Sequence, residues 1–321
     1  MNRPRANPNA QRPGAGGAPR RGARRPAAGA ALAAAQNRRP RGINENYARE
    51  LMELHTLGVE GGYTQKDVQE VARAFTGWTI QNPRLGGEFR FDPRVHDRRE
   101  KVVLGRRIRA GGGQEDGEQV LDILAKHPST ARFISTKLAR RFVADAPPAS
   151  LVDRAAKRFQ ETDGDIREVV RTIITSPEFF AAEAYRAKVK TPFEFVVSAV
   201  RATGTEVANG VPLAAAVREL GMPLYMCQPP TGYADRADAW VNTGALLNRM
   251  NFAVTLTGNR FRGPRANAAM PTADPDAVRD ALVHGPLGGD LSEATATTIA
   301  AARETPQVIA LVLGSPEFQR R

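Results

Sequence analysis

The residues best suited to chemistry lie in two short segments within the first hundred positions. Glu50 and His55 fall on one expected helix, and His96 is followed directly by Asp97. A carboxylate inside an apolar stripe resists ionisation unless a cation lies nearby, and proteins form general acids and metal ligands in this way. The candidate catalytic residues are therefore Glu50, His55, His96 and Asp97. Three of them, Glu50, His96 and Asp97, are also candidate metal ligands.

The spacing of Glu50 and His55 argues against a shared metal ion. On a regular helix, residues five apart point about 140° away from each other, so these two side chains cannot chelate one ion together. The alternative is structural: a buried ion pair between Glu50 and Arg73, with His96 and Asp97 capping a turn. Either interpretation requires a cation near Glu50.

A helical hairpin is expected to carry Glu50 and His55. At 100° per residue, the apolar arc of its first helix consists of Tyr47, Leu51, Leu54 and Leu57, and Glu50 falls inside it. Gly58, Gly61 and Gly62 then break the helix, and Thr64 is a suitable cap for the next one. The apolar stripe of the second helix is expected to contain Val68, Val71, Ala72, Phe75 and Trp78.

A short β segment is expected to carry His96 and Asp97. Residues 88–92 alternate with period two, and residues 101–105 form a short β-type run. We interpret residues 88–104 as a small β-hairpin excursion, with His96 and Asp97 at its bend.

The rest of the chain has helical periodicity. The expected helices are 118–126, 129–142, 150–161, 165–175, 192–202, 212–220, 234–257, 275–284, 292–303 and 306–313. The predicted fold is therefore mostly α, a multi-helix array joined mainly by short turns. Residues 43–321 are expected to form this helical domain. A division into two packed halves, 43–182 and 183–321, is left open.

The positive charge is concentrated in residues 1–42, a segment rich in Arg, Pro, Gly and Ala. It holds ten of the 46 basic residues and no acid, so 36 basic residues face 34 acidic ones in the remainder. We expect a disordered tail, because this composition cannot bury enough apolar surface to fold. A basic groove across the domain is not indicated. Nonspecific binding of nucleic acid would use tail residues such as Arg20, Arg21, Arg24, Arg25, Arg38, Arg39 and Arg41.

Targeting signals are weak in this sequence. The apolar run of the tail is nearly all alanine and lies behind many arginines, which is unlike a secretion signal. No stretch of 18 apolar residues is present, so no membrane span is expected. The single Cys227 excludes an internal disulfide framework.

Several motifs resemble a bacterial family named domain of unknown function 1800. They are Asn44–Leu51, His55–Val59, Ala74–Trp78, Phe91 with His96 and Asp97, Lys101–Gly105, His127–Pro128, Lys137–Ala139, Arg141–Phe142, Pro229–Tyr233 with Trp240, and Ser315–Phe318. The similarity covers about residues 36–321 and is expected to represent only the C-terminal part of the family. It implies a mostly helical fold, frequent export of full-length relatives, and genes often next to those of a sulfatase-like family. It implies no activity and no cofactor.

Three functions follow from these observations. The first is a non-enzymatic accessory or binding protein that acts with an exported sulfatase-like hydrolase. The second is a metal-dependent hydrolase with a site of Glu, His and Asp. The third is nonspecific nucleic-acid binding through the arginine tail.

Overall fold

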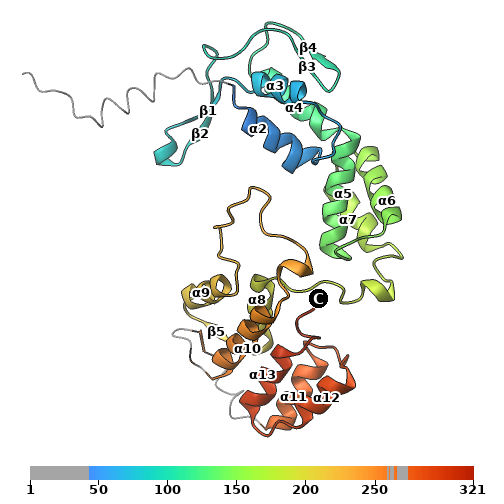
Figure 1. The fold of residues 1–321 in the computed structure, drawn as a ribbon, viewed down its shortest axis with the longest axis vertical. Helices are drawn as coiled ribbons and strands as arrows, with labels where there is room; N and C mark the ends of the chain where they lie inside the picture. The colour runs from blue at the N-terminus through green and yellow to red at the C-terminus, as the bar shows by residue number, and fades with distance from the viewer. Residues whose placement is uncertain (1–42, 259, 261–263, 266–273) are drawn as a thin grey trace, which may run out of the picture. The chain divides into compact units, whose positions relative to one another are not determined.

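The computed structural model describes residues 43–258, 260, 264–265 and 274–321. Within that part of the chain, twelve α-helices (α2–α13) and three pairs of short antiparallel strands are present (Figure 1). The predicted mostly α fold with a small β excursion is confirmed. Residues 43–321 form one compact unit. The expected disordered tail at 1–42 lies outside the described residues. None of the described helices has the length and apolar character needed to cross a membrane.

The first helix changes its winding halfway along. α2 (Glu45–Glu50) continues directly into a π-helical segment, Leu51–Thr56. The Leu57 amide donates to the Met52 carbonyl at 2.7 Å, five residues back. Because an i to i+5 pattern turns less per residue than an α-helix, Ala48, Met52 and Leu57 are the buried positions, in steps of four and five. The arc expected from a uniform 100° turn is therefore wrong.

The second helix is shorter than its apolar stripe suggested. α3 (Gln65–Ala74) begins with a capping box in which Thr64 and Asp67 each bind the other's backbone amide. Gly77 has φ +88°, a conformation that ends the helical path and suits glycine. Trp78 therefore belongs to a strand, and its expected place in the helix is wrong.

The β excursion consists of two hairpins. β1 (Trp78–Gln81) pairs with β2 (Glu88–Phe91), and β3 (Lys101–Val103) pairs with β4 (Arg106–Ile108). Residues 88–91 and 101–103 are thus strands as predicted, but they do not pair with each other. The second hairpin closes with two left-handed residues, Leu104 and Gly105, at φ +50° and +74°. Such a turn matches the twist of the strands that it joins.

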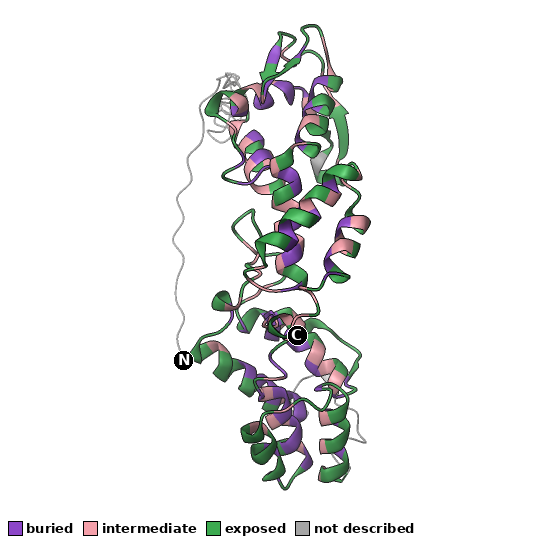
Figure 2. Ribbon diagram, turned by 90° about the vertical axis from the view of Figure 1, so that its right-hand side faces the viewer, coloured by how far each residue is buried: buried purple, intermediate pink, exposed green. Residues whose placement is uncertain are grey.

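Two groups of buried side chains hold the N-terminal part together. α4 (Gln114–Ala125) packs with the helical hairpin and β3–β4, and their shared core includes Met52, Val71 and Leu124. α5 (Pro128–Phe142), α6 (Ala149–Glu161) and α7 (Ile166–Ile174) lie side by side around a second core (Figure 1). Figure 2 shows the buried positions in purple on the faces where these helices meet.

The remaining helices surround a third core. They are α8 (Pro192–Ala202), α9 (Val211–Glu219), α10 (Thr243–Thr257), α11 (Pro275–His284), α12 (Glu293–Ala300) and α13 (Thr305–Gly314). Phe195, Leu256 and Val308 are among their buried contacts. The helix expected from residue 234 begins only at Thr243, because the Asn242 side chain accepts the Ala245 amide at 2.9 Å and caps it. Minor elements are 3₁₀ turns at Pro83–Leu85, Ala182–Ala184 and Ala237–Ala239, and the strand pair β5 (Glu206–Val207) and β6 (Pro264–Arg265).

Candidate functional site

A buried lysine lies at the centre of the region where a metal was anticipated. Lys101 on β3 is 1% exposed. Its ammonium donates to the backbone oxygens of Asp97 and Arg99 at 2.5 and 3.0 Å, and to Asp116 Oδ2 at 2.6 Å. An ammonium has three donors, and all three are satisfied here. Lys101 therefore supplies the cation for a set of oxygens that would otherwise suit a hard metal ion.

His96 is buried against the same carboxylate. Its Nδ1 lies 2.7 Å from the Thr76 carbonyl, and its Nε2 lies 3.2 Å from Asp116 Oδ2. Both ring nitrogens therefore lie within hydrogen-bond distance of buried oxygens. The aromatic edge of Phe91 covers the ring at 5.4 Å between centroids. Both nitrogens of His96 thus have partners within the protein, and neither is free to bind a metal.

Asp97 points into a different set of charges from its neighbour His96. Its carboxylate binds Arg73, with Nε to Oδ2 at 2.9 Å, and Arg99, with Nη2 to Oδ2 at 2.6 Å. Hydrogen bonds from Arg99 and then from Arg73 hold the pKa of Asp97 far below its usual value, although partial burial opposes this. Arg73 also binds Glu70 at 2.8 Å. Asp97 is therefore held as a carboxylate with its oxygens occupied by guanidinium groups.

The other two candidate residues lie elsewhere. Glu50 and His55 are exposed, and neither makes a side-chain hydrogen bond or ion pair within the described residues. The expected ion pair between Glu50 and Arg73 does not form, since Arg73 binds Glu70 and Asp97 instead. Ala48 is the buried residue of α2, and Glu50, two positions later and about 200° round the helix, faces away from the core.

The structure therefore places Asp97 against Arg73 and His96 against Asp116, and it brings neither of them to Glu50 or His55. Among the described residues, no three or more His, Cys, Asp or Glu side chains cluster as a metal site would require. The partner of His96 and Lys101 is Asp116, which the sequence does not single out. An acid in the first turn of a helix is common, because it favours the positive end of the helix dipole.

Two buried polar atoms beside this cluster lack partners in the described part of the chain. Asp116 Oδ1 and Trp78 Nε1 make no hydrogen bond there. The Trp78 indole packs against the first turn of α4 so closely that a Cβ on Gly117 would lie 2.6 Å from it. The cluster of His96, Lys101 and Asp116 thus connects β3, the loop between the hairpins and α4, and Trp78 on β1 packs beside it. Its charges mainly hold that loop in place.

The comparison with known families defines the class of the protein. The chain belongs to the family described as "Protein of unknown function (DUF1800)", which matches residues 21–320. The match begins earlier than the resemblance at 36–321 and takes in nearly the whole chain, so the expectation of a C-terminal part alone is wrong. No curated protein and no solved structure matches the chain.

Proposed function

We propose that this chain is a non-enzymatic binding protein that acts beside an exported sulfatase-like hydrolase. The family carries no defined activity, and the partner class comes from the gene neighbourhoods that the resemblance implies. The observation that best supports a binding role is an apolar stripe on the outer face of α10.

Helix α10 is apolar on two opposite faces. Phe252 and Leu256 lie on its buried face, which packs in the third core. Leu247, Met250 and Val254, spaced three and four residues apart, are 56%, 51% and 51% exposed. A helix that is apolar all round is normally covered on all sides. A contiguous apolar stripe on a surface is typical of a protein-binding site.

A groove extends this stripe. Met250 forms one side of a cavity of about 240 Å³ that is otherwise lined by α12, α13 and the residues that follow α13. Ile299 and Leu311 contribute apolar surface to it. The stripe and the groove together offer a ridge and an adjacent recess, and interface cores commonly have an anchor residue beside such a pocket.

The charges around His96 also support the proposal, because they argue against the alternative of a metal-dependent hydrolase. Lys101, Arg73 and Arg99 already neutralise the carboxylates that a metal-dependent hydrolase would need for its ion. Carboxylates that are already paired with buried or bidentate cations hold a loop in place more readily than they bind a metal ion.

The test is co-purification of the full chain with a sulfatase-like protein from the same genome. We expect the wild-type chain to form a complex, and Met250→Asp to weaken it by about tenfold or more, as for an interface anchor. Val59→Asp is the matched control, because Val59 is 71% exposed and lies outside α10. Failure of the wild-type chain to bind, or equal binding by Met250→Asp, would refute the proposal.

A further inference from the structure

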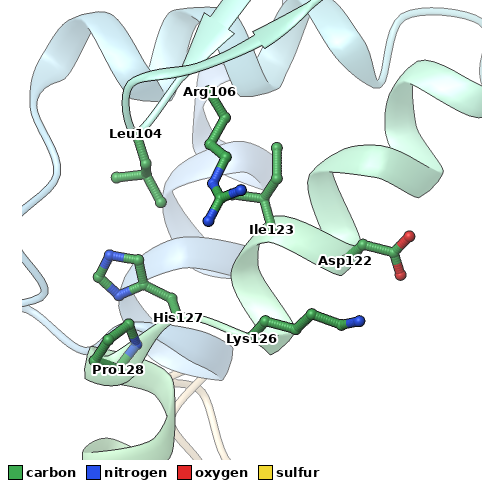
Figure 3. A pocket seen from close by; sticks show the side chains of 7 residues that line it. All are labelled: Leu104, Arg106, Asp122, Ile123, Lys126, His127 and Pro128. Atoms are coloured by element: carbon green, nitrogen blue, oxygen red, sulfur yellow. The ribbon is translucent and has the colours of Figure 1, made fainter. Parts of the chain in front are cut away.

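A small pocket lies apart from both regions described so far. Its volume is about 210 Å³, and it opens between the β3–β4 turn and the junction of α4 and α5 (Figure 3). Glu50, His55, His96 and Asp97 do not line it. Its polar side chains are those of Arg106 on β4, Asp122 and Lys126 at the end of α4, and His127 between the two helices.

His127 offers a hydrogen-bond donor to this pocket. Its Nδ1 accepts the Ser129 backbone amide at 3.1 Å and so caps α5. Because Nδ1 is an acceptor, the ring proton is on Nε2. Burial lowers the pKa of His127, which favours the neutral ring. Nε2 has no polar partner among the described residues, so its N–H is available to a ligand.

Arg106 offers a charged fork beside that donor. Its side chain makes no hydrogen bond or ion pair within the described residues, whereas the next residue, Arg107, binds Glu100 with Nε to Oε2 at 2.6 Å. In Figure 3, Arg106 extends from the strand toward the helix junction, on the same side as the His127 ring. A planar guanidinium matches the two oxygens of a carboxylate better than an ammonium does.

The charge balance of the pocket favours a singly charged anion. Arg106 and Lys126 are positive and Asp122 is negative, which leaves one net positive charge. In Figure 3, Asp122 and Lys126 carry their charged ends away from His127. The C-terminus of α4, with its negative partial charge, meets the N-terminus of α5, with its positive partial charge, at this junction. The two partial charges offset each other at the pocket. The positive charge of the Arg106 guanidinium therefore favours a negatively charged ligand.

The remaining wall of the pocket is apolar. Leu104, Ile123 and Pro128 form it. Leu104 adopts the left-handed φ of +50°, which a branched side chain rarely does, and its amide donates to Asp67 Oδ1 at 2.7 Å. The turn is thus held in place by α3, and the leucine side chain is fixed at the edge of the pocket. The volume lies below the roughly 300–1,000 Å³ of drug-sized sites, so a ligand must be small.

We propose that this pocket binds a short monocarboxylic acid. The carboxylate lies on Arg106 and on His127 Nε2, and the alkyl stem lies against Leu104, Ile123 and Pro128. This site is independent of the α10 surface and of any partner protein, so either proposal stands or fails alone.

The chain has only four histidines, which makes the test direct. In a sample labelled at histidine, NMR follows the ring signals of His127 while butyrate is added. We expect a saturable shift of the His127 signals alone, with a dissociation constant of about 1 mM. Arg106→Gln should weaken binding by about tenfold or more, because it removes the charged fork. Arg107→Gln, on the opposite face of the same strand, is the matched control and should change affinity less than about twofold.

Two further additions separate the possible ligands. Acetate, which lacks most of the stem, should bind about threefold or more weakly than butyrate, because each buried methylene contributes to affinity. Inorganic phosphate and sulfate should bind more weakly still. Static His127 signals, an unchanged affinity in Arg106→Gln, or equal affinity for sulfate and butyrate would each overturn the proposal. Unchanged His55, His96 and His284 signals in Arg106→Gln would show that the variant remains folded.

Discussion

Asp116→Asn tests whether the buried cluster contains compensated charge. The Asp116 and Lys101 side chains are 1% and 0% exposed, and the other two acceptors of the ammonium are neutral backbone oxygens. Asparagine keeps the shape and one acceptor but removes the only negative charge in contact with Lys101 and His96. Removal of one member of a buried ion pair typically costs about 3–5 kcal/mol, since it leaves the other charge uncompensated. The unfolding equilibrium should therefore shift by about two to nearly four powers of ten.

The assay is urea unfolding followed through Trp78, in a Trp240→Phe background so that the signal reports the region around the cluster. Asp153→Asn is the matched control: Asp153 pairs with Arg132, both side chains are 59% exposed, and such a surface pair contributes about 1 kcal/mol or less. Adding Lys101→Met to Asp116→Asn should restore at least half of the lost stability, because the uncompensated ammonium is then gone. If Asp116→Asn costs less than the surface control, or if the double variant is less stable than the single one, the reasoning is refuted.

Three other predictions concern stability. Burial lowers the pKa of Lys190 to about 8, so its charged form is disfavoured in the folded state. Lys190→Met should therefore stabilise the chain at neutral pH. Unfolding curves should show this gain in stability fading between pH 8 and 10.5. Asp97→Asn should lower the free energy of unfolding by about 1–3 kcal/mol at neutral pH. The pKa of Asp97 is lowered in the folded state, so its contribution to stability is lost as it is protonated. In acid denaturation, the stability difference between variant and wild type should therefore narrow below pH 3.8. Gly117→Ala places a Cβ 2.6 Å from the Trp78 indole and should destabilise the fold by about 1–3 kcal/mol in thermal melts. Gly244→Ala in α10 meets only an ordinary contact, so it should leave stability unchanged or raise it by up to about 1 kcal/mol. The first argument fails if Lys190→Met is less stable than wild type at neutral pH. The second fails if the stability lost in Asp97→Asn does not change with acid, and the third if both glycine variants change stability equally.

The helices could be predicted from the sequence because local signals mark where they begin. Thr64 and Thr191 form capping boxes, and Asp165 caps α7 as its position before an apolar stripe suggests. These interactions join residues two or three positions apart, so they depend little on the rest of the fold. The expected helix at residues 234–257 began too early because apolar periodicity alone does not reveal a cap at Asn242.

The pairing of the strands and the surroundings of Glu50 could not be predicted in the same way. Residues 88–91 pair backward with β1 because Gly77 turns the chain at Trp78, and a helical stripe that includes Phe75 hides that turn. Glu50 falls outside the core because α2 buries Ala48 on its opposite face, and an alanine does not mark that face in the sequence. Arg73, expected to pair with Glu50, instead binds Asp97, 24 residues away in sequence, and no local pattern marks such a partner.

The ammonium of Lys101 has one property that a bound ion lacks. It is covalently attached to the loop that it fastens, so its effective concentration at those oxygens is set by the chain and not by the surroundings. Dilution, competing ions or a change of compartment cannot remove it. The loop between the hairpins therefore carries its own cation and needs no ion from solution at these oxygens.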